Sequence, residues 1–342
     1  MNGSTRRYDI PAYTEGWFQI AWSRDIGKGK LRKVKQFGRE YTLFRGEDGK
    51  LGLIDDVCPH LGAHFSEGGR VKGNVVRCPY HAWEFDRTGT CTKIAYAKKI
   101  PKNARVNSYT VVERHGLIFM YRDKAGTAPD LDIPEIYDFD ADDYLEPKTY
   151  EFEIRIHGQD IMENTVDSAH FWAVHGHQMP KNAFFEKEGE LRVHQTTSVH
   201  QLGYTMNAQI EFHLSEPGFH YVHFPTLPGG AKAFVFSSIA PVDEEYTNHR
   251  LTVMVRKSPI PGFSKLLQRF ITWQMMKTYR EDMQIWESKE YHSRPVLCDG
   301  DGSIMKLRKW YAKFFEPQDE VQAATPSTAK RSPALGVASQ EG

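Results

Sequence analysis

The sequence predicts an α+β protein, with an all-β N-terminal domain and a C-terminal domain in which an antiparallel sheet packs beside a long helix. Short β-branched and aromatic runs separated by glycine-containing turns fill the first 125 residues. Longer strand-like runs then mix with a helical segment over residues 148–260. A long segment follows at 262–291, with apolar side chains at helical spacing. The length of 342 residues fits roughly two domains.

The composition excludes several classes of protein. Lysine plus arginine and aspartate plus glutamate both number 44, and a net charge of zero argues against broad nucleic-acid binding. A hydrophobic fraction of 40% excludes a mainly disordered chain. No apolar stretch approaches the ~18 residues of a membrane span, and the N-terminus lacks the apolar core of a secretory signal. We therefore expect a cytoplasmic protein with no membrane span and no nucleic-acid partner.

Five strands are expected in the first domain, residues 1–125. They cover residues 17–22, 39–45, 51–57, 74–78 and 116–122. Between Lys93 and Lys124 there are eight basic residues against two acids. This basic stretch is either a solvated face or a docking surface for an acidic electron-donor protein.

An acidic segment at residues 126–147, with seven acids before Tyr144 and three prolines, is predicted to be a linker. The second domain spans 148–316, and the tail 317–342, rich in Ala, Thr, Ser, Pro and Gln, is expected to be disordered. Helices are expected within 157–175 and over 262–291. Strands are expected at 150–156, 204–214, 220–224, 233–242 and 250–257.

Cys58 and His60 form the first half of a metal-binding pattern, and Cys78 and His81 form the second, with the spacing C-x-H-x17-C-x2-H. Each half is a short turn that offers one thiolate and one imidazole. Two thiolates on one iron and two imidazoles on the other describe a Rieske [2Fe–2S] centre. The alternative is a zinc site with the same ligands, although zinc fingers usually pair Cys with Cys and His with His.

A second pattern, E-x3-D-x2-H-x4-H, runs from Glu163 through Asp167 and His170 to His175. Two histidines and one remote carboxylate make the facial triad of non-haem Fe(II) oxygenases, which leaves positions open for O₂ and water. Because the two histidines are five residues apart, both can bind one iron only if the helix is distorted or ends between them. A histidine pair is often structural, but an upstream electron relay needs an acceptor.

The missing carboxylate is assigned to Asp282 on the predicted long helix. It shares a face with Met275, Tyr279 and Trp286, and an acid on an apolar stripe is costly unless it is paired or bound to a metal. Glu281 and Glu287 project elsewhere, and Glu281 is read as a surface charge. Asp167 lies one turn before His170. Its carboxylate can accept a hydrogen bond from the second nitrogen of that imidazole and can link the two metal centres. The alternative is that Asp167 is an ordinary acid on the helix surface.

The remaining cysteines and histidines are given no metal. Cys91 and Cys298 are expected to be buried or half-buried thiols, and His64 a loop residue. His220 and His223 face opposite ways on a strand and are assigned to the core or a pocket wall. Four strand aromatics could line that pocket, although such residues are more often core: Phe212, Phe224, Phe234 and Phe236. No role is given to His157, His177, His194, His200, His213, His249 and His292.

Both patterns resemble the oxygenase component of Rieske non-haem iron oxygenases, from about residue 8 to residue 316. The resemblance implies an N-terminal Rieske domain and a catalytic domain of the helix-grip (START-like) type. Segments 279–291, 294–302 and 307–315 are similar to the 3-ketosteroid 9α-hydroxylase and cholesterol 7-desaturase group. By this resemblance Cys58, His60, Cys78 and His81 bind the cluster, His170, His175 and Asp282 bind the mononuclear iron, and Asp167 and Asn164 belong to the catalytic site.

The resemblance further implies one [2Fe–2S] cluster and one Fe(II) per subunit, with O₂ as cosubstrate. No nucleotide-binding fingerprint or ferredoxin cysteine spacing is present in the sequence. Electrons would therefore come from a separate NAD(P)H-dependent partner, either a ferredoxin-type protein or a flavin/iron–sulfur reductase. The family forms head-to-tail homotrimers, in which the cluster of one subunit serves the iron of its neighbour.

The expected function is that of a terminal monooxygenase, which hydroxylates a C–H bond of a steroid-like apolar substrate. Aromatic-ring dioxygenation, O- or N-demethylation, and sterol desaturation or demethylation remain open on the same scaffold. A non-catalytic Rieske electron carrier is a more distant alternative, because a carrier has no use for His170, His175 and Asp282. No motif encodes the substrate or the carbon that is attacked.

Overall fold

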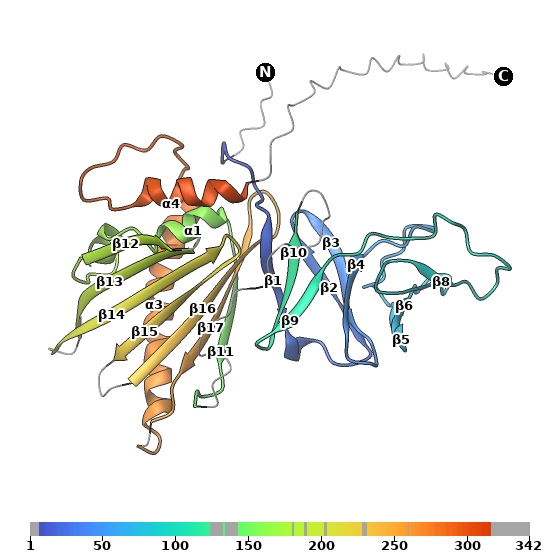
Figure 1. Cartoon of the computed structure of the whole chain (residues 1–342), viewed down its shortest axis with the longest axis horizontal. Coiled ribbons are helices and arrows are strands. Elements are labelled where there is room, and N and C mark those ends of the chain that lie inside the picture. Colours follow the sequence, from blue (N-terminus) through green and yellow to red (C-terminus); the bar gives the residue numbers. More distant parts are fainter. Residues whose placement is uncertain are drawn as a thin grey trace, which may run out of the picture.

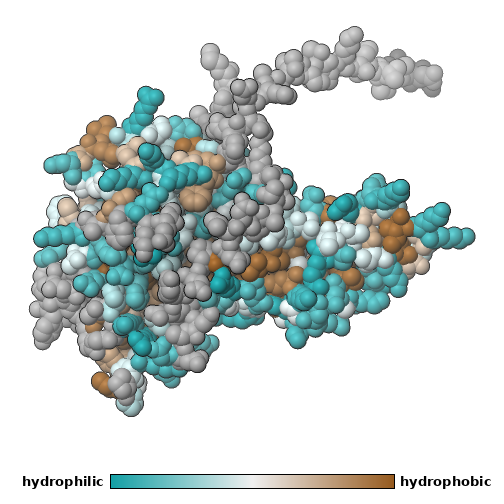
Figure 2. All heavy atoms as spheres, viewed as in Figure 1, coloured by the Kyte–Doolittle hydropathy of each residue, from teal (hydrophilic) through white to brown (hydrophobic). Residues whose placement is uncertain are grey.

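The computed structural model describes residues 7–123, 133, 143–179, 181–187, 190–201, 204–227, 231–258 and 260–315. The chain forms two lobes side by side (Figure 1), a smaller all-β lobe and a larger lobe in which one sheet carries a long helix on one face. The predicted α+β class is confirmed. None of the described helices is long and apolar enough to cross a membrane. On the face shown in Figure 2, hydrophobic atoms form small groups among hydrophilic ones on both lobes.

The smaller lobe contains three antiparallel sheets. One has the order β1 (Gly16–Trp22), β10 (Leu117–Arg122), β9 (Val111–Arg114). Another is β2 (Lys30–Gln36), β3 (Arg39–Arg45), β4 (Leu51–Asp55). The four-stranded sheet is β5 (Arg70–Lys72), β6 (Val75–Arg77), β7 (Glu84–Phe85), β8 (Cys91–Lys93). This last sheet lies at the outer end of the lobe (Figure 1). Cys58 lies in the segment between β4 and β5, and Cys78 lies in the loop between β6 and β7.

The larger lobe is built on a seven-stranded antiparallel sheet in the order β11-β17-β16-β15-β14-β13-β12. Its strands are β11 (Lys148–Ile154), β12 (Lys181–Lys187), β13 (Glu190–Gln201), β14 (Tyr204–Glu216), β15 (Phe219–Leu227), β16 (Ala231–Pro241) and β17 (Thr247–Val255). The five strands expected here are present, and β12 and β13 are additional. The predicted long helix is confirmed as α3 (Phe263–Ser288), which crosses one face of the sheet. The short helices α1 (Gly158–Glu163), α2 (Ala169–Ala173) and α4 (Ile304–Tyr311) complete the lobe.

The two faces of this sheet bury different apolar clusters, because strand side chains alternate between faces. Val222, Val235 and Leu251 pack toward α3. Phe234 and Phe236 lie on the opposite face, where the cluster includes Trp17 and Phe119 of the smaller lobe. Of the two alternatives left open for Phe234 and Phe236, the structure shows the core: they pack in the cluster that joins the two lobes. Phe212 and Phe224 do face the α3 side.

Most of the predicted linker 126–147 and the whole tail 317–342 lie outside the described residues. Two linker side chains are described as buried. Ile133 and Tyr144 both belong to the cluster between the lobes. Both side chains thus pack into the apolar interface that the two lobes share. The predicted domain limits remain predictions.

Candidate metal centres

The two Cys–His loops of the smaller lobe have the same backbone form. In the first, the Cys58 N–H donates to the Ala63 carbonyl (2.8 Å), and the Gly62 N–H donates back to the Cys58 carbonyl (3.0 Å). Gly62 has φ 76°, in the left-handed region that glycine tolerates. These bonds close a tight turn that holds the thiol and the following imidazole on one side.

The second loop repeats this arrangement twenty residues later. The Cys78 N–H donates to the Trp83 carbonyl (2.8 Å), and the Ala82 N–H donates to the Cys78 carbonyl (3.2 Å). Ala82 occupies the position of Gly62 and also has a positive φ, 59°. A non-glycine residue in this region is uncommon and costs conformational energy, which the surrounding loop must offset.

The loops bring the predicted ligands together. The ring centroids of His60 and His81 are 4.6 Å apart, and His60 stacks on Trp83 at 4.5 Å with an interplanar angle of 10°. Both thiols are free and buried. Burial, together with the neighbouring Cys78, raises the pKa of the Cys58 thiol to about 12, so that a bound cation is needed to hold it as a thiolate.

The donor set fits an iron–sulfur cluster rather than a closed protein network. The Nδ1 atom of His60 is buried and has no hydrogen-bond partner among the described residues. Such a nitrogen is expensive to leave unpaired unless it binds something that the protein itself does not supply. Two thiols and two imidazoles with this open nitrogen match the ligand chemistry of a Rieske centre.

A fully buried carboxylate anchors the first loop. Asp56 accepts hydrogen bonds from the Ser66 N–H (2.8 Å), the Ser66 hydroxyl (2.6 Å) and the Thr42 hydroxyl, and it lies 2.8 Å from His64 Nδ1. Burial raises the pKa of Asp56, but the bonds from Ser66, Thr42 and His64 outweigh it and hold the pKa below its usual value. Asp56 thereby ties β3 to both ends of the loop that carries Cys58 and His60.

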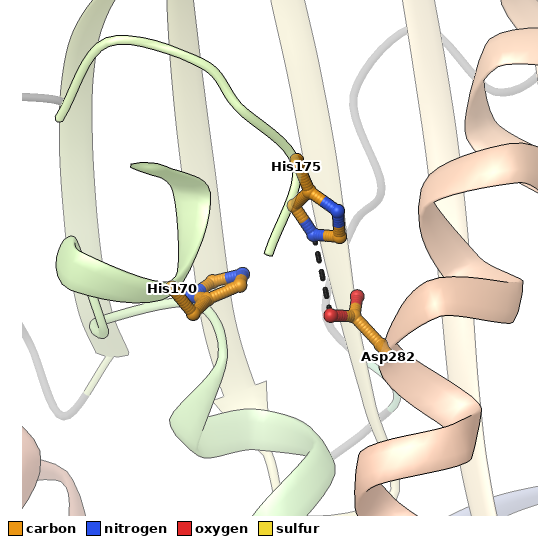
Figure 3. Close-up of side chains that lie close together, drawn as sticks. All are labelled: His170, His175 and Asp282. Carbon is orange, nitrogen blue, oxygen red and sulfur yellow. Dashed lines mark ion pairs between the residues drawn. The ribbon is translucent and has the colours of Figure 1, made fainter. Parts of the chain in front are cut away.

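The second centre lies between α2 and α3. Figure 3 shows His170 from α2 and His175 from the following loop turned toward Asp282 on α3. His175 Nε2 is 3.2 Å from the Asp282 carboxylate, and one ligand atom from each of the three residues lies within 4.8 Å of the others. Helix α2 ends at Ala173, between the two histidines, as their five-residue spacing requires.

Both imidazoles are held by their Nδ1 atoms, so that their Nε2 atoms are available to a metal. His170 Nδ1 lies 2.7 Å from the backbone carbonyl of Asp167, and His175 Nδ1 lies 2.9 Å from the Glu281 carboxylate. Each acceptor fixes its ring as the Nδ1–H tautomer. This is the state that a metal-binding imidazole needs.

The two histidines differ in charge environment. Burial lowers the pKa of His170 and outweighs the carboxylates of Asp282 and Asp167. Burial also lowers the pKa of His175, but Asp282 and Glu281 reverse the effect, and its pKa lies above the usual value. Two nitrogens and a carboxylate that leave one side open suit a divalent iron with free positions for small ligands.

The structure changes two sequence-based assignments near this centre. The backbone carbonyl of Asp167, rather than its carboxylate, is the hydrogen-bond acceptor for His170. The carboxylate is 30% exposed, lies 3.9 Å from that Nδ1 and caps α2 through the Ala169 N–H (2.9 Å). Glu281, read from the sequence as a surface charge, instead orients His175. The sequence contained a hint of this role, because Glu281 directly precedes Asp282, the predicted metal ligand.

The remaining residues singled out in the sequence lie near α3 or in other parts of the two lobes. Asn164 ends α1, and its side-chain oxygen accepts a 3.4 Å hydrogen bond from the Trp286 indole, which brings it to the helix that carries Asp282. Glu287 is exposed. Cys91 is buried as expected, whereas Cys298 is exposed and not half-buried.

Comparison with known proteins bears on both lobes. Residues 16–110 match the Rieske [2Fe-2S] domain, and residues 120–315 match the 3-ketosteroid 9alpha-hydroxylase C-terminal domain. A probable 3-ketosteroid-9-alpha-monooxygenase oxygenase component of Rhodococcus rhodochrous is 28% identical over 91% of this chain and 82% of its own length. Cholesterol 7-desaturase nvd of Bombyx mori is 28% identical over 89% of this chain and 70% of its own.

Solved structures with the same fold include dicamba monooxygenase bound to dicamba, with a TM-score of 0.73 at 18% identity, covering 88% of this chain and 97% of that one. NdmA of Pseudomonas putida CBB5 has a TM-score of 0.71 at 19% identity, covering 87% and 89%. The family and relative matches confirm the predicted enzyme class, an oxygenase, and its Rieske [2Fe–2S] cluster. The chain belongs to the Rieske oxygenases that carry the 3-ketosteroid 9α-hydroxylase C-terminal domain.

Proposed function

We propose that this chain is the terminal oxygenase of a multicomponent monooxygenase that hydroxylates a steroid-like apolar substrate. The observation that carries the proposal is the open group of His170, His175 and Asp282 beside the apolar face of the seven-stranded sheet. The relatives named as 3-ketosteroid 9-alpha-monooxygenase oxygenase components support the steroid class. Their name also implies a separate reductase.

The residue roles follow from chemistry and placement. Cys58, His60, Cys78 and His81 would hold the cluster, and His170, His175 and Asp282 would hold the mononuclear iron. When bound, these groups supply single-electron transfer and O₂ activation. The chain itself positions the substrate against the iron ligands, keeps water from the apolar face, and fixes the ligand imidazoles through the Asp167 carbonyl and Glu281.

The placement of the centres favours electron transfer between subunits of a head-to-tail homotrimer. The Cys–His loops lie by the outer sheet β5–β8, whereas α3 lies in the other lobe, with the remaining sheets of the smaller lobe between them (Figure 1). The Asp167 carboxylate is partly exposed beside His170. It is therefore accessible to a residue of a neighbouring subunit.

The electron donor is proposed to be a ferredoxin-type protein or a flavin/iron–sulfur reductase that uses NAD(P)H. The basic stretch 93–124 offers a docking surface on the cluster-bearing lobe, where Lys93, Lys98, Lys99 and Lys102 are exposed. An acidic donor would be attracted there, and its docking would weaken with salt. The predicted cytoplasmic location belongs to the same proposal.

A second candidate reaction is desaturation of a sterol, which the similarity to cholesterol 7-desaturase nvd favours. The two outcomes differ in mass: hydroxylation adds one oxygen atom to the substrate, and desaturation removes two hydrogens. Mass spectrometry of the products formed from 3-ketosteroids and from cholesterol distinguishes them.

The assignment of the mononuclear centre is tested with Asp282→Ala. We expect turnover to be abolished and the mononuclear iron to be lost, while the absorption and paramagnetic spectra of the reduced cluster stay unchanged. Glu287→Ala, an exposed acid on the same helix, is the control and should keep its activity. Steroid-dependent O₂ consumption by Asp282→Ala would refute the ligand assignment.

A further inference from the structure

The face of the seven-stranded sheet that packs against α3 carries a line of polar side chains within an apolar layer. His220 lies on β15, Ser237 on β16 and His249 on β17, so the line crosses three neighbouring strands. All three side chains are buried. Their neighbours on this face include Val222 and Val235. A polar line in such a layer needs an explanation, because burying polar groups is unfavourable unless they are paired.

One end of the line is connected to the helix that carries the proposed iron ligand. Ser237 Oγ lies 2.6 Å from His249 Nε2, and His249 Nδ1 is hydrogen-bonded to the Tyr279 hydroxyl. Tyr279 is on α3, one turn before Asp282. The line therefore begins next to the mononuclear centre and runs away from it across the sheet.

The other end of the line is His220, which has a ring nitrogen without a partner in the described part of the chain. His220 is paired in register with Ser237, and its Nδ1 is buried without a hydrogen-bond partner among the described residues. Burial lowers the pKa of His220 to about 4, so the ring is neutral near pH 7. Burial and the nearby His220 lower the pKa of His249 to about 3. A neutral imidazole offers one donor and one acceptor, so it can bond either a carbonyl or a hydroxyl group.

The surrounding charge restricts what can bind there. On strands β13–β17, the described buried side chains that face α3 are apolar or neutral. Arg250 on β17 points to the opposite face, where it donates to the Gln19 carbonyl. A carboxylate placed beside His220 would thus lose its hydration without gaining a cation. A neutral oxygen atom on an apolar molecule would gain a hydrogen bond without that cost.

We propose that His220, Ser237 and His249 form a neutral hydrogen-bonding subsite that receives a ketone or hydroxyl oxygen of the apolar substrate. The inference rests on the proposed function, since it concerns how the proposed apolar substrate would be recognised on the sheet face beneath α3. The subsite selects neutral oxygenated substrates over hydrocarbons and over carboxylates. Because the line also reaches Tyr279, a substrate held at His220 is fixed in relation to the helix of Asp282.

The test is equilibrium binding, measured by anaerobic calorimetry on the full-length, iron-replete protein. The probes are androst-4-en-3-one and its deoxy analogue androst-4-ene, each carried in the same detergent. We expect the wild-type protein to bind the ketone about 10- to 100-fold more tightly, because the deoxy compound leaves the buried imidazole unpaired. His220→Leu should lose this preference while its affinity for androst-4-ene stays within about 3-fold.

His213→Leu is the matched control. His213 is also a buried histidine with an unpartnered Nδ1, and burial lowers its pKa to about 4. It lies on the opposite face of the same sheet, stacked on Tyr221 at 4.4 Å. Its substitution should leave the preference for the ketone unchanged. Ser237→Ala provides a second variant of the subsite if His220→Leu does not fold, and it should reduce the preference by about 3- to 10-fold.

The outcomes separate the two hypotheses. Equal wild-type affinity for both steroids, or the same loss of preference in His213→Leu, would overturn the subsite. Equal weakening of both steroids in His220→Leu and Ser237→Ala would likewise show that the residues serve only the fold. If the wild-type protein binds neither steroid and consumes no O₂ with either, the proposed steroid oxygenase function itself fails.

Discussion

At the scale of single residues, the two imidazoles of the mononuclear centre are oriented by different kinds of acceptor. His170 is held by the Asp167 backbone carbonyl, three residues earlier. No side-chain substitution removes that acceptor directly. His175 depends on the side chain of Glu281, which comes from a helix more than a hundred residues later. The orientation of His175 is thus the more vulnerable of the two.

Glu281→Ala should weaken metal binding, because the Nδ1–H tautomer of His175 loses its acceptor. Outer partners of this kind are worth roughly 10- to 100-fold in metal affinity. Glu281→Gln keeps an acceptor oxygen and should lose less. The measurement is titration of iron-depleted protein with Co²⁺, followed by its visible absorption, with Glu287→Gln as the control. Equal affinity in Glu281→Ala and the control would contradict the positioning role.

Asp56 has a comparable role in the smaller lobe. In Asp56→Ala, Thr42 and Ser66 lose a buried acceptor, which costs roughly 2–4 kcal/mol of stability. We expect a lower cluster content per chain, measured by iron and acid-labile sulfide analysis, and a lower unfolding midpoint. Glu40→Gln, which removes only a partly exposed carboxylate 3.3 Å from His64, is the control. Full cluster content in Asp56→Ala would show that the loop does not need this anchor.

At the scale of elements, the short helices beside the mononuclear centre are joined by a nearly buried ion pair. Glu163 at the end of α1 receives two hydrogen bonds from Arg308 of α4, at 2.6 and 3.1 Å. Asn164 and the loop to His170 follow directly. This pair fixes the point from which the chain turns toward the metal ligands.

Arg308→Gln should destabilise the protein by about 3–5 kcal/mol, because Glu163 is left buried without its cation. The double variant Glu163→Gln/Arg308→Gln should recover part of that loss. Urea unfolding of the single and double variants measures both effects. Arg155→Gln, which removes the exposed Arg155–Glu245 pair, should leave the unfolding midpoint unchanged. If Arg308→Gln is as stable as the double variant, the unpaired Glu163 does not destabilise the protein, and the prediction is contradicted.

The sequence predicted the elements whose patterns are local. The long helix and most strands with continuous apolar runs were found, and the break between His170 and His175 followed from their spacing. Strand β2, KLRKVKQ, was missed because it is largely charged and buries only Val34 and Gln36. Glu281 was misassigned for a related reason: its partner comes from a distant segment, so only the packing of α3 beside the loop that carries His175 reveals the hydrogen bond.

At the scale of the whole molecule, an aromatic cluster joins the two lobes. Trp17 and Phe119 of the smaller lobe pack with Phe219 and Phe236 of the sheet. Rings of this size bury a large apolar area, so the lobes should move as one body. Neither centre lies in that interface. The interface between the lobes therefore leaves both centres unobstructed, which is compatible with the proposed electron transfer between subunits.

One carboxyl group at this interface should make stability depend on pH. Glu216 lies on β14 against Gly16, and burial, only partly offset by the Trp17 N–H, raises its pKa from 4.5 to about 7. The folded state thus holds this proton more tightly than the unfolded state, so stability falls as pH rises from about 4.5 to about 7. Glu216→Gln removes this titrating group. The variant should be more stable than wild type by about 3 kcal/mol at pH 8, whereas its gain in stability at pH 5 should be less than about 1 kcal/mol. Urea unfolding at the two pH values measures the difference, with the exposed Glu153→Gln as control. A gain of the same size at both pH values would mean that the charge of Glu216 is not its cause.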